Sequence, residues 1–265
     1  MSNSDLIFII GRQRSGTTVF RDLLARHGAI DCDEIFHGAL NHKCRFYGYV
    51  AKCVAKDPQL VHPEHHPFLF RKYITDLRAE AQGSPLVMDV KYFGLNLIPQ
   101  REDVDGRSPF VINFMRETQS NVVQIIRRNK LRVHVSEQIA KVTGRWSVGR
   151  PEHMVTDKPK VKIDVETAKN FIHNLIVRDK RVSKMLENMP CGHRIFYEDM
   201  FDASGLFSSD VQAVAAQVLG CDGDYSKAGN MKMNPEPLSE LVENFAELEC
   251  ALNKTPHDWM LFEGT

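Results

Sequence analysis

The sequence predicts an α/β fold, a three-layer sandwich in which helices flank a mostly parallel central sheet. Three observations support this class. Short apolar runs of strand length alternate with longer segments whose apolar residues recur at helical spacing. The first run, residues 6–10, is apolar at every position, as expected of a strand buried on both faces of a parallel sheet. Basic residues follow the second and third runs, so we expect those strand ends at one edge of the sheet.

The other elements are predicted from the same patterns in chain order. Residues 17–27 form the first expected helix, because its apolar residues recur at helical spacing and Gly28 offers a stop. Residues 68–81 resume a helical pattern until a Gly-Ser-Pro sequence breaks it. The later strands are expected at residues 86–90, 122–126 and 194–197. The later helices are expected at residues 131–144, 165–188, 209–219 and 238–252.

Composition limits the classes of partner. Lys and Arg number 34, as do Asp and Glu, so the net charge of zero gives no global attraction to nucleic acid or to an anionic membrane. No apolar run approaches the roughly 20 residues of a membrane span, and the first residues lack the pattern of a signal peptide, so we expect a cytoplasmic protein. The 265 residues are expected to form a single domain, 1–265. The six scattered cysteines are expected to be mostly reduced, with a Cys44–Cys53 disulfide left open.

The turn after the first strand has the position of a phosphate-binding loop. Residues 11–18 read Gly-Arg-Gln-Arg-Ser-Gly-Thr-Thr, between a strand and the amino end of a helix, where backbone amides can hold an anion. The spacing is that of a Walker A loop, but Thr17 stands where that motif requires lysine. An ATPase or a kinase is therefore disfavoured. Arg12 and Arg14 supply positive charge instead.

The sequence Arg-Ser-Gly-Thr-Thr resembles the 5′-phosphosulfate loop of sulfotransferases that use 3′-phosphoadenosine 5′-phosphosulfate (PAPS). The resemblance implies a P-loop-type fold, PAPS as donor, 3′-phosphoadenosine 5′-phosphate (PAP) as product, and no metal. It implies that the loop holds the donor, with Arg14 beside the bridging oxygen, where negative charge develops. The implied cofactor-binding residues here are Arg12, Arg14, Ser15, Gly16, Thr17 and Thr18.

A second segment resembles the 3′-phosphate site of the same family. Arg128 follows the third expected strand and Ser136 lies eight residues later in the next expected helix. A guanidinium and a hydroxyl presented in this way suit a phosphate dianion. A solvated basic helix start is the alternative interpretation. Lys232, in a later loop, is a further candidate ligand by the same resemblance, or a surface residue.

The transfer also needs a base near the first loop. Residues 31–37 are similar to the bacterial trehalose and glycan sulfotransferase branch, whose proposed base is the Glu of a Glu-Phe-Phe-like sequence. This implies Glu34 as the base, with His37 as the alternative. Lys91 ends the second expected strand, and it would stabilise the leaving oxygen or orient the acceptor, unless it forms a structural ion pair.

The predicted function is therefore sulfuryl transfer from PAPS to a hydroxyl of a carbohydrate or glycolipid-like acceptor, with Glu34, Arg14 and Lys91 as catalytic residues. A nucleotide-dependent kinase and an inactive nucleotide-binding module remain alternatives. We expect acceptor binding near residues 37–66 and 145–163, where the pattern is irregular and Trp146 could stack on a ring. The His-rich segment 62–66 is followed and interrupted by prolines, which disfavours a metal site.

Overall fold

The computed structural model describes residues 5–40, 42–99, 108–146, 159–229 and 234–262. The chain divides into two compact units. The first contains Met1–Ile126 and Val182–Lys227, and the second contains Arg127–Arg181 and Ala228–Thr265.

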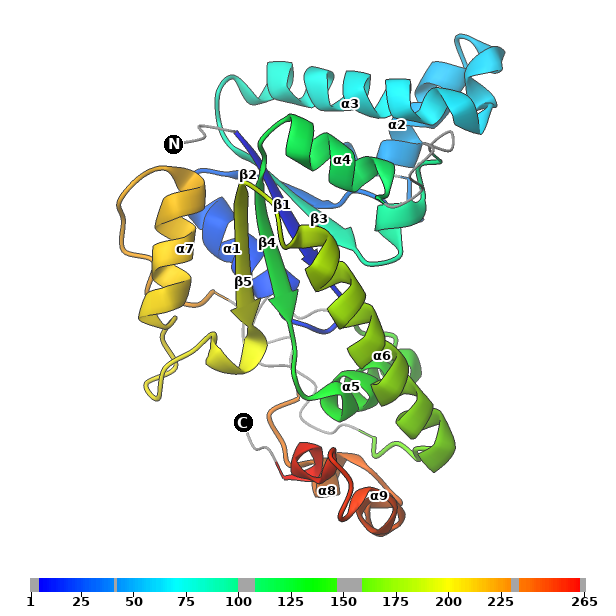
Figure 1. Cartoon of the computed structure of the whole chain (residues 1–265), viewed down its shortest axis with the longest axis vertical. Coiled ribbons are helices and arrows are strands. Elements are labelled where there is room, and N and C mark those ends of the chain that lie inside the picture. The colour runs from blue at the N-terminus through cyan, green and yellow to red at the C-terminus, as the bar shows by residue number, and fades with distance from the viewer. Residues whose placement is uncertain (1–4, 41, 100–107, 147–158, 230–233, 263–265) are drawn as a thin grey trace. The chain divides into compact units, whose positions relative to one another are not determined.

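The first unit is built on a parallel sheet with the strand order β2-β3-β1-β4-β5 (Figure 1). The strands are β1 (Leu6–Gly11), β2 (Ile30–Glu34), β3 (Leu86–Lys91), β4 (Asn121–Ile126) and β5 (Cys191–Phe196). Every neighbouring pair is parallel. The three central strands are buried at every position because helices cover both faces of the sheet.

Helices of the first unit cover the sheet from its two sides (Figure 1). They are α1 (Thr17–Arg26), α2 (Phe46–Val54), α3 (His66–Ala81), α4 (Phe110–Glu117) and α7 (Ser209–Leu219). Phe8 of β1 meets Phe114 of α4 with ring centroids 6.3 Å apart, and Phe114 also contacts Phe70 of α3. Asp89 is the register partner of Ile9, and Ile9 points to the opposite face of the sheet from Phe8. Asp89 pairs with Arg21 of α1. Helices α1 and α4 therefore lie on opposite faces of this sheet.

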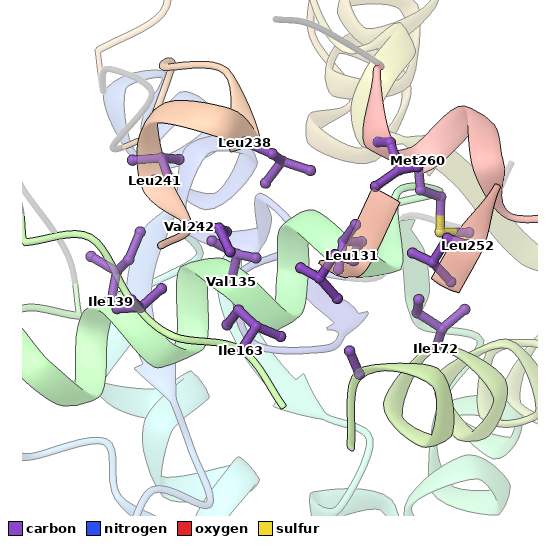
Figure 2. Close-up of a cluster of buried hydrophobic side chains, with 14 residues drawn as sticks. Leu131, Val135, Ile139, Ile163, Ile172, Leu238, Leu241, Val242, Leu252 and Met260 are labelled. Carbon is purple, nitrogen blue, oxygen red and sulfur yellow. The ribbon is translucent and has the colours of Figure 1, made fainter. Parts of the chain in front are cut away.

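The second unit is helical and has its own core. It contains α5 (Lys130–Thr143), most of α6 (Val165–Leu186), α8 (Leu238–Leu241) and α9 (Phe245–Leu252). Leu131, Val135 and Ile139 repeat along one side of α5 and pack in a buried cluster with residues from the other helices (Figure 2). This cluster lies wholly within the second unit, so it packs α5 against other elements of that unit.

Most predicted elements are confirmed, and the fold class is confirmed at the level of a parallel α/β sheet flanked by helices. Among the described α-helices and β-strands, β2, α2 and α4 were not predicted. The prediction of a single helix over 238–252 is wrong. Val242, which lies between α8 and α9, is extended and forms a β-bridge with Val161. Across the part of the chain that is described, no helix combines the length and the apolar character needed to span a membrane.

Candidate functional site

The candidate residues of the first unit gather at the carboxyl edge of its sheet. Gly11 at the end of β1 is the register partner of Lys91 at the end of β3, and Glu34 at the end of β2 is the partner of Asp89. In open parallel sheets this edge is where ligands bind. Strand pairing thus brings together three short sequences that are far apart in the chain.

The turn between β1 and α1 has the backbone of a tightly folded loop. Arg14 and Gly16 both have positive φ, of 66° and 92°. The amide and the hydroxyl of Ser15 both donate to the carbonyl of Arg12, at 3.3 and 2.6 Å. Gly11 admits no side chain, because a Cβ there would lie 2.7 Å from Cγ2 of Thr17. The loop therefore folds back against the end of its own strand, with the first amides of α1 beside it.

Tyr197 is a neighbour of this loop that sequence reasoning missed. It directly follows β5, and a Cβ on Gly16 would lie 2.5 Å from its Cδ2. The ring therefore packs on Gly16 and requires glycine there. The only signal in the sequence was its position at the end of the expected strand 194–197, where parallel strands deliver side chains to the ligand edge.

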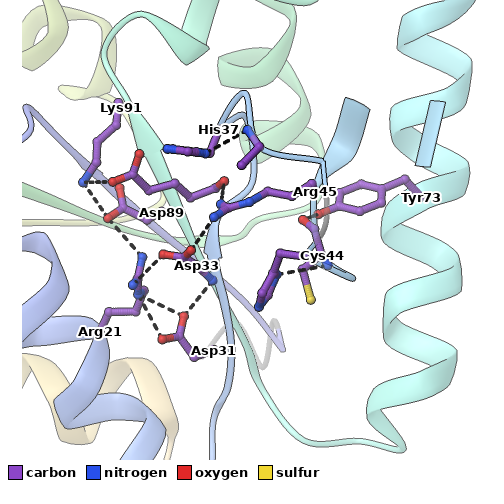
Figure 3. Close-up of polar contacts among 12 residues, drawn as sticks. Arg21, Asp31, Asp33, His37, Cys44, Arg45, Tyr73, Asp89 and Lys91 are labelled. Atoms are coloured by element: carbon purple, nitrogen blue, oxygen red, sulfur yellow. Dashed lines mark hydrogen bonds and ion pairs between the residues drawn. The ribbon is translucent and has the colours of Figure 1, made fainter. Parts of the chain in front are cut away.

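Lys91 connects the loop to the acidic residues. Its Nζ donates to Oγ1 of Thr17 at 2.6 Å. It also donates to Oδ2 of Asp89 at 2.7 Å (Figure 3). The same Nζ lies 3.5 Å from Oε1 of Glu34. Lys91 is only 4% exposed. The ion pair considered in the sequence is thus present, and the ammonium group also contacts the loop and the candidate base.

Arg21 holds Asp89, which pairs with Lys91, together with two carboxylates of β2. Its guanidinium lies 2.9 Å from Asp31, 2.7 Å from Asp33 and 3.4 Å from Asp89 (Figure 3). Burial, the largest influence, raises the pKa of Asp31 despite the nearby Arg21. Burial also opposes ionisation of Asp33, but the charges of Arg21 and Arg45 outweigh it and lower its pKa. Asp33 is therefore held as an anion between two arginines.

The two candidate bases differ in their surroundings. Glu34 has a side chain that is 23% exposed and reaches the buried Lys91. His37 is exposed, and its Nδ1 accepts a hydrogen bond from the amide of Ala39 at 3.0 Å. One nitrogen of His37 is thus used in a local turn, whereas the Glu34 carboxylate faces the cation beside the loop.

The remaining candidate residues belong to the second unit. Arg128 is half-buried two residues after β4, and Ser136 is buried in α5. Oγ of Ser136 accepts a hydrogen bond from Nδ2 of Asn234 at 3.1 Å. Arg132 donates to the carbonyls of Asn234 and Glu236, so it anchors that segment beside Ser136.

Other basic residues of this segment have structural partners. Lys130 forms a buried ion pair with Asp179. Lys130 and Arg132 are two of the basic residues behind the alternative interpretation of this segment as a solvated helix start, and both have partners within the protein. Lys232 lies outside the described residues, as do most of residues 145–163. Trp146 is 50% exposed after α5.

No grouping of three or more metal-ligating side chains occurs within the described ranges. The six cysteines are all free. No protein-family model matches the chain, and no curated protein matches it. The functional assignment therefore depends on the residues themselves.

Proposed function

We propose that this protein is a sulfotransferase that moves a sulfuryl group from PAPS to a hydroxyl of a carbohydrate or glycolipid-like acceptor. The observation that carries the proposal is the position of Lys91. Its ammonium group contacts Thr17 of the candidate loop and lies near the carboxylate of Glu34. A cation and a base therefore flank the place where an anion at the loop would be attacked.

The loop residues have proposed roles that follow its geometry. The amides at the start of α1, with Ser15 and Thr17, would bind the 5′-phosphosulfate. Thr17 replaces the lysine of a Walker A loop, and Lys91 brings an ammonium to its hydroxyl from the neighbouring strand. Arg14 would neutralise charge on the bridging oxygen together with Lys91, which could instead orient the acceptor.

The proposed reaction is an in-line displacement at sulfur. The acceptor oxygen forms a bond to sulfur while the bond from sulfur to the bridging oxygen breaks. The electron pair of the broken bond stays on the bridging oxygen, which becomes an oxygen of the 5′-phosphate of the departing PAP. The proton of the acceptor hydroxyl passes to the carboxylate of Glu34. No metal is needed in this scheme.

The 3′-phosphate of the same nucleotide is proposed to bind Arg128 and Ser136. The hydroxyl oxygen of Ser136 accepts a hydrogen bond from Asn234, and this bond fixes the position of the hydroxyl. A planar guanidinium and a fixed hydroxyl together favour a phosphate over a free ribose hydroxyl. Selectivity for a 3′-phosphorylated nucleotide follows from this assignment.

A nucleotide-dependent kinase is the second candidate, because an ammonium beside the loop would also suit the phosphates of ATP. Calorimetric titration with PAP, ADP and ATP with magnesium separates the two. We expect PAP to bind about 100-fold more tightly than ADP, since a hydrogen bond to a charged group contributes about 1.5–3 kcal/mol. Arg128→Ala should abolish this preference. Tighter binding of ATP, dependent on magnesium, would support the kinase instead.

The role of Glu34 is tested by turnover of radiolabelled PAPS against a panel of sugars and glycolipids. Glu34→Gln should lower kcat about 100- to 10,000-fold, the usual contribution of a general base, while PAP affinity is unchanged. His37→Gln is the matched control and should retain activity. Near wild-type turnover of Glu34→Gln would show that another residue is the base.

A further inference from the structure

We propose that Arg45 is a positioning residue that holds a bulge in β2 and thereby aims the carboxylate of Glu34 at Lys91. The proposal rests on the proposed function for the role of Glu34 as base. It adds a residue to which no sequence motif assigned a role. The geometry that supports it is contained in the first unit.

The bulge is visible in the register of β2 with β3. Asp31 is the partner of Val87, but Glu34 is the partner of Asp89. Two residues of β2 therefore oppose one residue of β3, which is the definition of a β-bulge. Asp33, one of the two, has a left-handed backbone with a φ of 55°. Its amide donates to Oδ1 of Asp31 at 2.7 Å.

The bulge decides on which face of the sheet Glu34 lies. Val87, Asp89 and Lys91 are two residues apart along β3, so they share the face that α1 covers. In a regular strand Asp33 would oppose Asp89, and Glu34 would point to the other face. The extra residue puts Glu34 opposite Asp89 instead, on the same face as Lys91. Without the bulge the candidate base would be turned away from the loop.

Arg45 holds Asp33 of the bulge and Glu34, the residue that follows it. Its guanidinium donates to Oδ2 of Asp33 at 2.5 Å and also to the carbonyl of Glu34 (Figure 3). The fork of one planar group thus fixes the left-handed residue and the residue after it. Lysine presents its donors from a single nitrogen, so it lacks the planar fork whose two ends reach these two acceptors. Arg45 is 7% exposed, so water does not easily replace these bonds.

Arg45 is itself fixed from both sides along the chain. The hydroxyl of Tyr73 donates to the carbonyl of Cys44 at 2.7 Å. The amide of Phe46, the first residue of α2, donates to the carbonyl of Ile35 at 2.8 Å. The first bond ties Cys44 to α3, and the second ties the start of α2 to the residue that follows β2. Arg45 lies between these two tied residues and is therefore held against the end of β2.

The first test is structural and does not need activity. Crystal structures of wild type, Arg45→Lys and Asp33→Asn are compared for the separation of Glu34 Oε1 and Lys91 Nζ, which is 3.5 Å here. Asparagine tolerates the left-handed backbone, so Asp33→Asn removes the charge that Arg45 binds without forcing the fold. We expect both variants to lose the Glu34–Lys91 contact. An unchanged contact in both would overturn the proposal.

The second test is kinetic and shows whether Arg45 acts through Glu34. Arg45→Lys should lower kcat about 100-fold, as misplacement of a reacting group by about 1 Å can do, and leave PAP affinity within about two-fold. In the Glu34→Gln background the same substitution should lower kcat less than about two-fold. Equal losses in both backgrounds would contradict the proposal.

The matched control is Arg78→Lys, which changes an exposed arginine paired with Asp5 at 2.8 Å in the same unit. It should leave kcat and the Glu34–Lys91 separation unchanged. If wild type transfers no sulfuryl group to any acceptor, the proposed function fails. The crystal structures then still decide whether Arg45 positions Glu34.

Discussion

Lys91 and Asp89 form a buried ion pair. Its contribution to the stability of the protein can be measured separately from catalysis. Asp89 is 1% exposed, and its Oδ1 has no hydrogen-bond partner among the described residues. Its Oδ2 contacts both Lys91 and Arg21. Two cations therefore compensate one buried carboxylate. Removal of either partner leaves charge in a place where water cannot solvate it.

We predict that Lys91→Met lowers the free energy of unfolding by about 3–5 kcal/mol, the cost of leaving a buried carboxylate without its main partner. The double variant Lys91→Met/Asp89→Asn should be more stable than Lys91→Met alone, because asparagine carries no charge. Urea denaturation at neutral pH measures both. If the double variant is less stable by the sum of the single effects, the two side chains are not coupled.

Helix α5 begins at a residue with two structural roles. Oδ1 of Asn129 accepts a hydrogen bond from the amide of Arg132 at 2.9 Å, which caps the helix. Its Nδ2 donates to the carbonyl of Met260, also at 2.9 Å. The cap and the tie to the C-terminal segment are both within the second unit. The start of the helix that carries Ser136 is therefore fixed by one amide group.

We predict that Asn129→Ala lowers the free energy of unfolding by about 2–3 kcal/mol, from loss of the cap and of the bond to Met260. Asn129→Ser keeps an acceptor for the cap and loses only the donor, so it should cost about 1 kcal/mol less. Thermal and urea denaturation would measure the difference. Equal losses would show that capping contributes nothing at this helix.

At the scale of the whole molecule, the proposal requires both compact units to respond to one nucleotide. The loop with Ser15 belongs to the first unit, and α5 with Ser136 belongs to the second. Hydrogen exchange reports on each unit separately, because it measures local opening of individual segments. A nucleotide that lacks the 3′-phosphate serves as the matched control.

We predict that PAP at about 100 times its Kd slows amide exchange about 100-fold in the loop and in the first turn of α5. Adenosine 5′-phosphate should slow exchange in the loop only. Exchange measured by mass spectrometry on wild type and Arg128→Ala separates these effects. Protection of α5 by both nucleotides alike would contradict the assignment of Arg128 and Ser136 to the 3′-phosphate.

The long elements could be predicted because their patterns are local. A continuous apolar run predicts β1, and apolar spacing predicts α1 and α3, without knowledge of the partners. The element β2 was missed because Asp31, Asp33 and Glu34 make three of its five residues acidic, and acidic residues are rare in strands. Its strand conformation depends on pairing with β3 and on the arginines that hold its carboxylates.

The sequence by itself determined the parallel α/β class and the loop between a strand and a helix, because propensity and side-chain periodicity act over a few residues. The candidate residues Arg14, Glu34 and Lys91 came from the resemblance to sulfotransferases. Only the tertiary structure decided that Lys91 contacts Thr17, 74 residues away, and that Arg45 holds the end of β2. Strand register and a one-residue bulge set these contacts, and both depend on pairing between distant segments.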